Sequence, residues 1–275
     1  MDRYNVVLIQ PPGYPHSLAL MDVARLLDCS FRSLGRQSEI RVNQFDPGAA
    51  NVVVGYHLVP DAGAALPDRY IVYQLEQLCG VPEWLRPGHL EILRRAEQVW
   101  EYSPQNLPFL AQHGIERSRL LPLGFHEELQ TIVPQTPRFD VLFYGSINRR
   151  RQEILSRLAR RVRLKTLFGV YGDARDQYIA CSRIVLNVHY YESQLMEQVR
   201  LSYLLNNRCC VVSEDSPDNP YEDAVLTAPY HDLVECCCRR LASPSSPDLA
   251  AETGFEFFRR RKMVDYLAQI LGKEP

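Results

Sequence analysis

The sequence predicts an α/β fold in which two Rossmann-like domains face each other across a cleft. Short apolar runs alternate with longer segments whose apolar residues recur at helical spacing, which is typical of parallel sheets covered by helices. A stretch with two prolines and no periodicity, 131–137, divides this alternation. The alternation restarts at the apolar run 139–144. We therefore expect a first domain over 1–133 and a second over 138–250.

The first half opens on a buried strand that ends at the turn formed by Gln10, Pro11, Pro12 and Gly13. Strands are expected at 4–9, 39–43, 51–57, 69–75, 98–102 and 120–123, and helices at 17–34, 89–96 and 104–113. Ser103 is the expected cap of the last of these helices, and Gly114 ends it.

In the second half we expect strands at 139–144, 164–168, 184–188 and 209–213, with helices at 150–162 and 176–181 and after Ser193. Ile154, Leu158 and Val162 place an apolar stripe on the first helix. A last helical stretch, 249–271, follows a Ser/Pro-rich segment. We expect the residues 251–275 to return to the first domain.

The composition excludes several classes of protein. With a formal net charge of −2, the chain has no global basic field for nucleic acid or membrane surfaces. It has no run of the roughly 18 apolar residues that span a bilayer. The start MDRYNVVLIQPPG has no signal-peptide pattern. We expect a cytoplasmic protein. The basic run 149–165 carries an apolar stripe, which indicates a helix packed on the sheet rather than a nucleic-acid-binding segment.

The eight cysteines are expected to be reduced and mostly buried. Several are adjacent in sequence, at 209–210 and 236–238, where ordinary disulfide geometry is strained. A zinc site built from His231 and the 236–238 cluster would lack the spaced pairs of Cys or His ligands found in structural zinc sites, so no metal site is expected.

Three predicted strands of the second half end in polar or glycine-containing segments. Gly145-Ser146-Ile147-Asn148 follows the first strand, with Arg150 and Arg151 close behind. Gly169-Val170-Tyr171-Gly172 follows the second, and His189-Tyr190-Tyr191-Glu192 follows the third. Ligands of open parallel sheets bind at the carboxyl ends of the strands. These segments therefore form the predicted binding edge.

The third segment leads into a helix for which Ser193 is the expected N-cap. The amides of Gln194 and Leu195 would then be free at a helix N-terminus, which attracts anions. Nearby guanidinium groups add charge-assisted hydrogen bonds to phosphate. Together these groups are suited to the diphosphate of a nucleotide.

Two acids stand close to this phosphate site. Glu192 lies at its lip and Glu197 about one turn into the predicted helix, three residues before Arg200. One interpretation is that the carboxylates accept hydrogen bonds from sugar or ribose hydroxyls. The other is that Glu197 and Arg200 form a surface i, i+3 ion pair worth a few tenths of a kcal/mol.

The second half resembles the donor-binding domain of GT-B glycosyltransferases of the "glycosyl transferases group 1" kind. The resemblance rests on VLFYGSINRRRQEIL, GVYGDARD and LNVHYYESQLMEQVRLSYLLNNRCCVVSE, and it covers about 139–214. It implies a GT-B architecture, Tyr171-Gly172 beside the nucleotide base, and no metal requirement, in keeping with the absence of a D-x-D motif. The donor-binding residues that we predict are Gly145, Ser146, Asn148, Arg150, Arg151, Tyr171, Gly172, His189, Tyr190, Glu192, Ser193, Gln194, Leu195, Glu197 and Arg200.

The sequence departs from this family at one position. Many retaining members carry two glutamates eight positions apart, whereas the residue eight positions after Glu192 is Arg200. Glu197 is the candidate replacement, and Arg200 is otherwise a further phosphate contact. The stereochemistry of the reaction and the nucleotide therefore stay open.

The first half is expected to supply the acceptor side and any catalytic base. Glu76 is the first candidate, because it follows a strand at its carboxyl end. His16 and His57 follow two other strands. Each has a structural alternative, since Glu76 is also suited to capping a helix and His57 to a hydrogen-bonded place in the core.

These features predict a hexosyltransferase-like enzyme that moves a sugar from a nucleotide-diphosphate sugar, with UDP as the expected nucleotide, to an acceptor that is a protein, a glycan or a small molecule. The alternative is a non-catalytic GT-B-like module that binds a nucleotide or a protein partner. A third option is a GT-B-like epimerase. The absence of G-x-G-x-x-G argues against a nicotinamide oxidoreductase.

Overall fold

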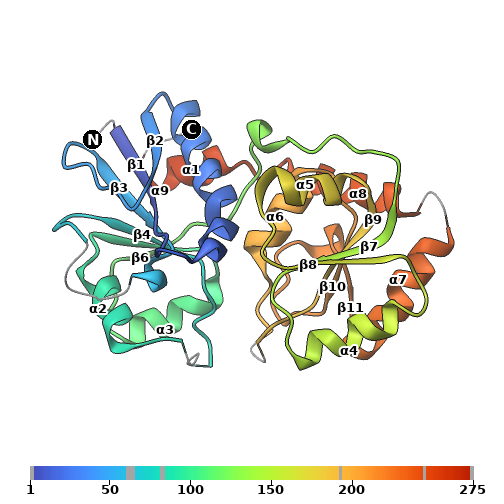
Figure 1. Cartoon of the computed structure of the whole chain (residues 1–275). Helices are drawn as coiled ribbons and strands as arrows, with labels where there is room; N and C mark the ends of the chain where they lie inside the picture. The colour runs from blue at the N-terminus through green and yellow to red at the C-terminus, as the bar shows by residue number, and fades with distance from the viewer. Residues whose placement is uncertain (1–2, 60–65, 81–83, 192–193, 244–245, 273–275) are drawn as a thin grey trace. The chain divides into compact units, whose positions relative to one another are not determined.

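The computed structural model describes residues 3–59, 66–80, 84–191, 194–243 and 246–272 (Figure 1). The chain forms two compact units. The first comprises Met1–His126 and Lys262–Pro275, and the second comprises Glu127–Arg261. Each contains one parallel sheet with helices, so the predicted α/β class is confirmed.

The first unit contains a six-stranded parallel sheet of order β2-β1-β3-β4-β5-β6. Its strands are β1 (Arg3–Leu8), β2 (Gln37–Val42), β3 (Ala50–Val54), β4 (Ile71–Gln74), β5 (Gln98–Glu101) and β6 (Ser118–Leu120). Its helices are α1 (Met21–Ser33), α2 (Pro87–Arg95), α3 (Leu107–Gln112) and α9 (Met263–Ile270), with 3-10 turns η1 (Pro15–Leu20), η2 (Tyr56–Leu58) and η3 (Pro104–Asn106).

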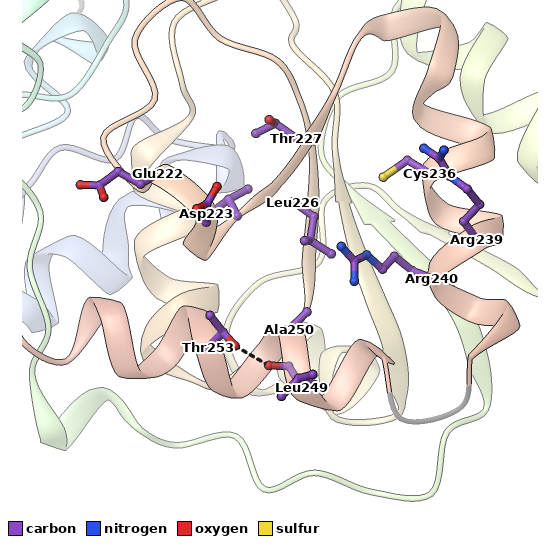
Figure 2. A pocket seen from close by; sticks show the side chains of 11 residues that line it. Glu222, Asp223, Leu226, Thr227, Cys236, Arg239, Arg240, Leu249, Ala250 and Thr253 are labelled. Carbon is purple, nitrogen blue, oxygen red and sulfur yellow. Dashed lines mark hydrogen bonds between the residues drawn. The ribbon is translucent and has the colours of Figure 1, made fainter.

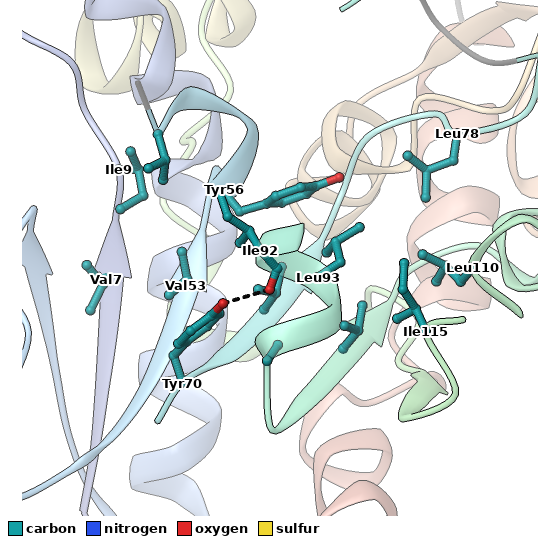
Figure 3. Packing of buried hydrophobic residues seen from close by; sticks show 14 of the residues in the cluster. Val7, Ile9, Val53, Tyr56, Tyr70, Leu78, Ile92, Leu93, Leu110 and Ile115 are labelled. Carbon is teal, nitrogen blue, oxygen red and sulfur yellow. Dashed lines mark hydrogen bonds between the residues drawn. The ribbon is translucent and has the colours of Figure 1, made fainter. Parts of the chain in front are cut away.

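A buried apolar cluster joins this sheet to α2 and α3 (Figure 3). Val53 and Val72 on the central strands are fully buried, and Ile92 and Leu110 pack against them from the helices. Burying each such side chain contributes about 1.5–3 kcal/mol. The hydroxyl of Tyr70 donates to the carbonyl of Ile92 at 2.7 Å, so its polar end is satisfied inside the cluster.

The second unit contains a five-stranded parallel sheet of order β11-β10-β9-β7-β8. Its strands are β7 (Phe139–Tyr144), β8 (Leu164–Leu167), β9 (Ser182–Asn187), β10 (Val211–Glu214) and β11 (Leu226–Ala228). Its helices are α4 (Arg149–Leu158), α5 (Gly172–Ala180), α6 (Gln198–Asn206), α7 (Leu233–Ala242) and α8 (Ser246–Phe258), with 3-10 turns η4 (Glu127–Leu129), η5 (Glu222–Ala224) and η6 (Tyr230–Asp232). Ile154 and Leu158 of the predicted stripe are buried in the core of this unit, whereas α4 ends at Leu158 and Val162, beyond it, is partly buried against the same core.

The boundary between the units lies at His126–Glu127, before the predicted linker. The stretch 131–137 is not a free connection, because Asn207 accepts hydrogen bonds from the amides of Thr131 (2.9 Å) and Ile132 (3.0 Å). These contacts attach the beginning of the stretch to α6 of the second unit.

Three predictions of elements were wrong. The single helix expected over 249–271 is two helices, α8 and α9, separated by an extended residue at Lys262. Strand β11 and helix α7 were not predicted; β11 is an edge strand of three residues, too short for a clear alternation. The helix expected at 176–181 begins earlier, at Gly172.

The end of the chain belongs to the first unit. Helix α9 packs against α1, and the guanidinium of Arg119 donates to the carbonyl of Ile270 at 3.1 Å. The amide of Met263 donates to the carbonyl of Phe125 at 2.9 Å. These bonds fix both ends of α9.

Candidate functional site

The sheet of the second unit reverses its strand order between β7 and β9. From β7 the chain moves to the edge strand β8 and then returns to the other side of β7 as β9. Such a topological switch point is where open parallel sheets bind ligands. Gly145 and His189 lie just beyond the carboxyl ends of β7 and β9, and Glu214 ends the neighbouring strand β10.

Gly145 gives this edge room for two guanidinium groups. Its φ of +130° is unusual for other residues, and a Cβ there would lie 2.8 Å from Nη2 of Arg200 and 3.7 Å from Nη1 of Arg151. A glycine is therefore required if the backbone, Arg151 and Arg200 are to lie this close together.

The loop after β7 is fixed by Asn148. Its side chain accepts a hydrogen bond from the amide of Arg151 at 3.0 Å and so caps α4. Its amide nitrogen donates to the carbonyl of Tyr190 at 3.0 Å, which joins the loops after β7 and β9. Ser146 remains exposed beside them.

Arg151 lies below this loop and is buried. Its guanidinium donates to the carbonyls of Val188 (2.8 Å) and Ser146 (2.8 Å), and it lies 3.4 Å from Glu197. Burial, and then the charge of Arg200, lower its pKa to about 10. The side chain stays cationic at neutral pH.

His189 and Glu197 form a buried pair. Nδ1 of His189 lies 2.9 Å from Glu197, and Nε2 lies 2.9 Å from the carbonyl of Asp215. Two acceptors at the two ring nitrogens favour the imidazolium form. Burial lowers the pKa of His189, but the hydrogen bond with Glu197 and its charge outweigh burial, so the pKa is raised.

The carboxylate of Glu197 is held in its charged form. Asn187 donates to it at 2.7 Å, and Nδ1 of His189 forms an ion pair with the same oxygen at 2.9 Å. Burial raises its pKa, but the hydrogen bond and charge of His189 and the charge of Arg200 outweigh burial and lower the pKa to about 2. The predicted surface ion pair between Glu197 and Arg200 is wrong, since Arg200 instead donates to Asn187 at 2.7 Å.

Glu214 is a residue of this site that the sequence reading missed. Both terminal nitrogens of Arg150 donate to its two carboxylate oxygens, and the amide of His189 donates to it at 3.1 Å. The Glu214 side chain is 2% exposed and that of Arg150 is 25% exposed. The only indication of Glu214 in the sequence was that an acid ends the apolar strand VVSE.

The predicted helix N-terminus after the third strand is wrong. Helix α6 begins at Gln198, and Gln194 has a φ of +52° with its amide donating to the carbonyl of Tyr191 at 3.4 Å. Leu195 is buried. The predicted helix start is wrong because the residues before Gln198 instead bring the carboxylate of Glu197 to His189 and Asn187. Glu192 and Ser193 lie outside the described residues.

Two exposed tyrosines after β9 and the N-terminus of α5 border the same edge. Tyr190 and Tyr191 are 40% and 36% exposed, their rings lie edge to face, and Arg151 lies 5.1 Å from the Tyr190 ring. Tyr171 is the N-cap residue of α5, whose first residue is Gly172. These positions place aromatic surface and a helix N-terminus beside the switch point.

The first unit brings two of the three catalytic candidates together. Nε2 of His57 lies 3.4 Å from Oε1 of Glu76, with the side chains 18% and 27% exposed. The ring of Trp84 lies 5.5 Å from that of His57. His16 packs edge to face on Tyr14.

A buried acid, Glu101, stands behind Glu76, and the sequence reading did not select it. It accepts hydrogen bonds from Gln74 (3.1 Å), Asn106 (2.9 Å) and the amide of Ser103 (2.8 Å). Burial raises its pKa to about 8 against these hydrogen bonds, which lower it. Ser103 itself caps η3 through the amide of Gln105, which confirms its predicted role.

A cavity of about 750 Å³ lies elsewhere in the second unit, among η5, β11, α7 and α8 (Figure 2). Arg239 and Arg240 line it from α7, and Leu249 lines it from α8. None of the predicted donor-binding residues lines it. The switch-point edge, rather than this cavity, carries the groups suited to a nucleotide.

The described cysteines are free and five of them are buried, which confirms the expected thiols. The described part of the second unit holds no group of three His, Cys, Asp or Glu side chains spaced to share a metal ion. His231 lies 3.5 Å from Asp232 and is exposed. No helix in the described ranges is long and apolar enough to cross a bilayer.

No protein-family model matches the chain. Two uncharacterised proteins of Acanthamoeba polyphaga mimivirus are similar to it: L138 is 27% identical over 194 residues and L137 is 30% identical over 148 residues. These matches cover 63% and 51% of this chain but only 22% and 19% of the two proteins. The chain thus spans about a fifth of the length of these curated relatives.

Solved structures match the chain over nearly its whole length. WaaG, a glycosyltransferase involved in lipopolysaccharide biosynthesis, superposes with a TM-score of 0.61 at 11% identity, covering 98% of both chains. The DNA modifying enzyme β-glucosyltransferase gives 0.60 at 9% identity and 99% coverage of both. AviGT4, a glycosyltransferase involved in avilamycin A biosynthesis, gives 0.55 at 14% identity, also covering 99% of both.

The chain has the GT-B fold. Each of its two parallel sheets forms the centre of one of the two Rossmann-like domains expected from the alternating sequence. Its switch-point edge belongs to the second of them, which contains the segments that resemble a donor-binding domain.

Proposed function

We propose that this GT-B chain is a glycosyltransferase whose second unit binds a nucleotide-diphosphate sugar. The observation that carries the proposal is the convergence of two guanidinium groups, Arg151 and Arg200, on Gly145 at the β7/β9 switch point, with a third, Arg150, beside the carbonyl of His189. Phosphate accepts charge-assisted hydrogen bonds from such groups. The carboxylates of Glu197, 16% exposed, and Glu214, 2% exposed, balance only part of this charge.

The same groups suit the chemistry of sugar transfer. When the bond between the sugar and the diphosphate breaks, negative charge develops on the leaving phosphate, and fixed cations nearby stabilise that charge. UDP is the proposed nucleotide, because the structurally similar β-glucosyltransferase was solved with its substrate uridine diphosphoglucose. Glu76, supported by His57, is the proposed base for an acceptor hydroxyl.

We expect UDP and UDP-sugars to raise the midpoint of thermal unfolding, because a ligand that binds only the folded state stabilises it, by about 2.7 kcal/mol at a hundred times Kd. Arg200→Gln should remove most of this shift. Arg160→Ala, which removes an exposed arginine beyond the end of α4, should keep it. No shift in the wild-type protein with any nucleotide or nucleotide sugar would count against a donor site here.

Transfer should not depend on a divalent cation, since guanidinium groups are proposed to neutralise the diphosphate. We expect turnover of a UDP-sugar in the presence of an acceptor panel to persist in EDTA. Restoration of a lost activity by Mg²⁺ or Mn²⁺, after EDTA treatment, would contradict this part of the proposal.

One observation favours the second candidate function, a non-catalytic module that binds a nucleotide. Arg150, whose side chain is 25% exposed, is already engaged by Glu214. A module of this kind would show the thermal shift with UDP but no loss of sugar from UDP-sugars with any acceptor. Measuring release of UDP separates the two functions.

A further inference from the structure

The backbone of Glu76 is held by two side-chain amides. Gln74 donates to its carbonyl at 2.6 Å and accepts from its amide at 2.8 Å. Asn106 donates to the same carbonyl at 2.9 Å and accepts from the amide of Leu78 at 3.0 Å. The peptide groups on either side of the Glu76 side chain are thereby fixed.

Glu101 orients both of these amides at once. The nitrogen of Gln74 also donates to Oε2 of Glu101 at 3.1 Å, and that of Asn106 to Oε1 at 2.9 Å. Each amide thus divides its two N–H groups between Glu101 and the carbonyl of Glu76. Gln74, Glu101 and Asn106 are all 0% exposed. Each oxygen of Glu101 faces N–H donors, a pattern that an ionised carboxylate satisfies and an amide does not.

A purely structural role does not require this arrangement. The 3-10 turn η3 is already capped by the hydroxyl of Ser103. Burying a carboxylate costs several kcal/mol, whereas a neutral side chain would fill the same place without that cost. What the carboxylate provides is a fixed orientation for Gln74 and Asn106, and through them a fixed place for Glu76 beside His57.

We propose that Glu101 is a positioning residue that holds Glu76 in place through Gln74 and Asn106. The inference rests on the proposed function, in which Glu76 receives the proton of the acceptor hydroxyl. In Glu101→Gln, the new amide group would point its N–H groups at the N–H groups of Gln74. Gln74 would then turn, and the carbonyl of Glu76 would lose a donor.

The test compares Glu101→Gln, Gln74→Glu and the double variant. At pH 9, above the Glu101 pKa of about 8, we expect Glu101→Gln to lower kcat at least tenfold while the KM for the UDP-sugar stays within twofold. The double variant should recover only part of kcat: the carboxylate introduced at position 74 would accept from the amide introduced at position 101 and from the amide of Glu76, but the carbonyl of Glu76 would keep only the donor of Asn106. Glu91→Gln, on the exposed face of α2, is the matched control and should keep kcat.

A second readout does not require turnover. The ring-proton NMR resonances of His57 should move in Glu76→Gln and in Glu101→Gln, return toward wild type in the double variant, and stay in place in Glu91→Gln. If the wild-type protein transfers no sugar but His57 responds in this way, the proposed function fails and the positioning role stands. If Glu101→Gln is folded and leaves both kcat and the His57 resonances unchanged, the positioning role is overturned.

Discussion

Glu197→Gln is expected to lower the free energy of unfolding of the second unit by about 3 kcal/mol near pH 5.5, from the shift of the Glu197 pKa from 4.5 to about 2. The substitution leaves the buried His189 facing a neutral amide and weakens the contact with Arg151. Urea unfolding followed by circular dichroism measures the loss.

The loss should depend on pH in a direction that the two pKa shifts determine. The folded pKa of Glu197 lies below its ordinary 4.5, so its contribution is present above pH 4.5 and is lost as pH falls toward 2. The folded pKa of His189 lies above 6.5, so its contribution is present below pH 6.5 and is lost as pH rises through the folded value. The difference between wild type and variant should therefore be largest between these limits.

Two internal controls make the result specific. Trp84 and Trp100 both belong to the first unit, so their fluorescence reports whether that unit is disturbed. Glu235→Gln breaks an exposed ion pair with Arg161 in the second unit and should change little. If Glu197→Gln lowers the free energy of unfolding equally at pH 2.5, 5.5 and 9, then packing rather than charge causes the loss.

Gly145→Ala is expected to weaken binding of UDP at least tenfold, about 1.4 kcal/mol, while the protein still folds. The added methyl would lie 2.8 Å from Nη2 of Arg200, the mobile end of a long side chain. The guanidinium would move aside more easily than the backbone, and the arrangement of Arg200 and Arg151 around the loop would be lost. Isothermal titration with UDP measures the change.

Gly169→Ala is the matched control. Gly169 also has a positive φ, +70°, but a Cβ there would meet no atom within 4 Å. Both variants place an alanine at positive φ, although +130° at Gly145 lies farther from the left-handed helical region than +70° at Gly169, and only Gly145→Ala adds the collision. Equal weakening of UDP binding by both variants would mean that strain alone is responsible, and unchanged binding in Gly145→Ala would remove the loop from the donor site.

The sequence determined the parts of this protein that depend on near neighbours along the chain. The apolar runs before Gln10 and Gly145 became the buried strands β1 and β7, because only a covered parallel sheet satisfies such runs. Asn148 capped α4 and Ser103 capped η3, since capping is a bond over two or three residues. The strand ends at Gly145 and His189 were sufficient to predict that these two segments lie at one edge of the sheet.

Only the tertiary structure decided which charged groups meet at that edge and how they are paired. Arg150 and Glu214 are 64 residues apart, and Gln74 and Glu101 are 27 apart. Helix α6 begins only after Glu197, whose carboxylate contacts His189, Asn187 and Arg151 rather than lying in a helix that starts at Ser193. Periodicity and capping act within a few residues, whereas the cost of burying a charge is met by whatever partner the folded sheets bring beside it.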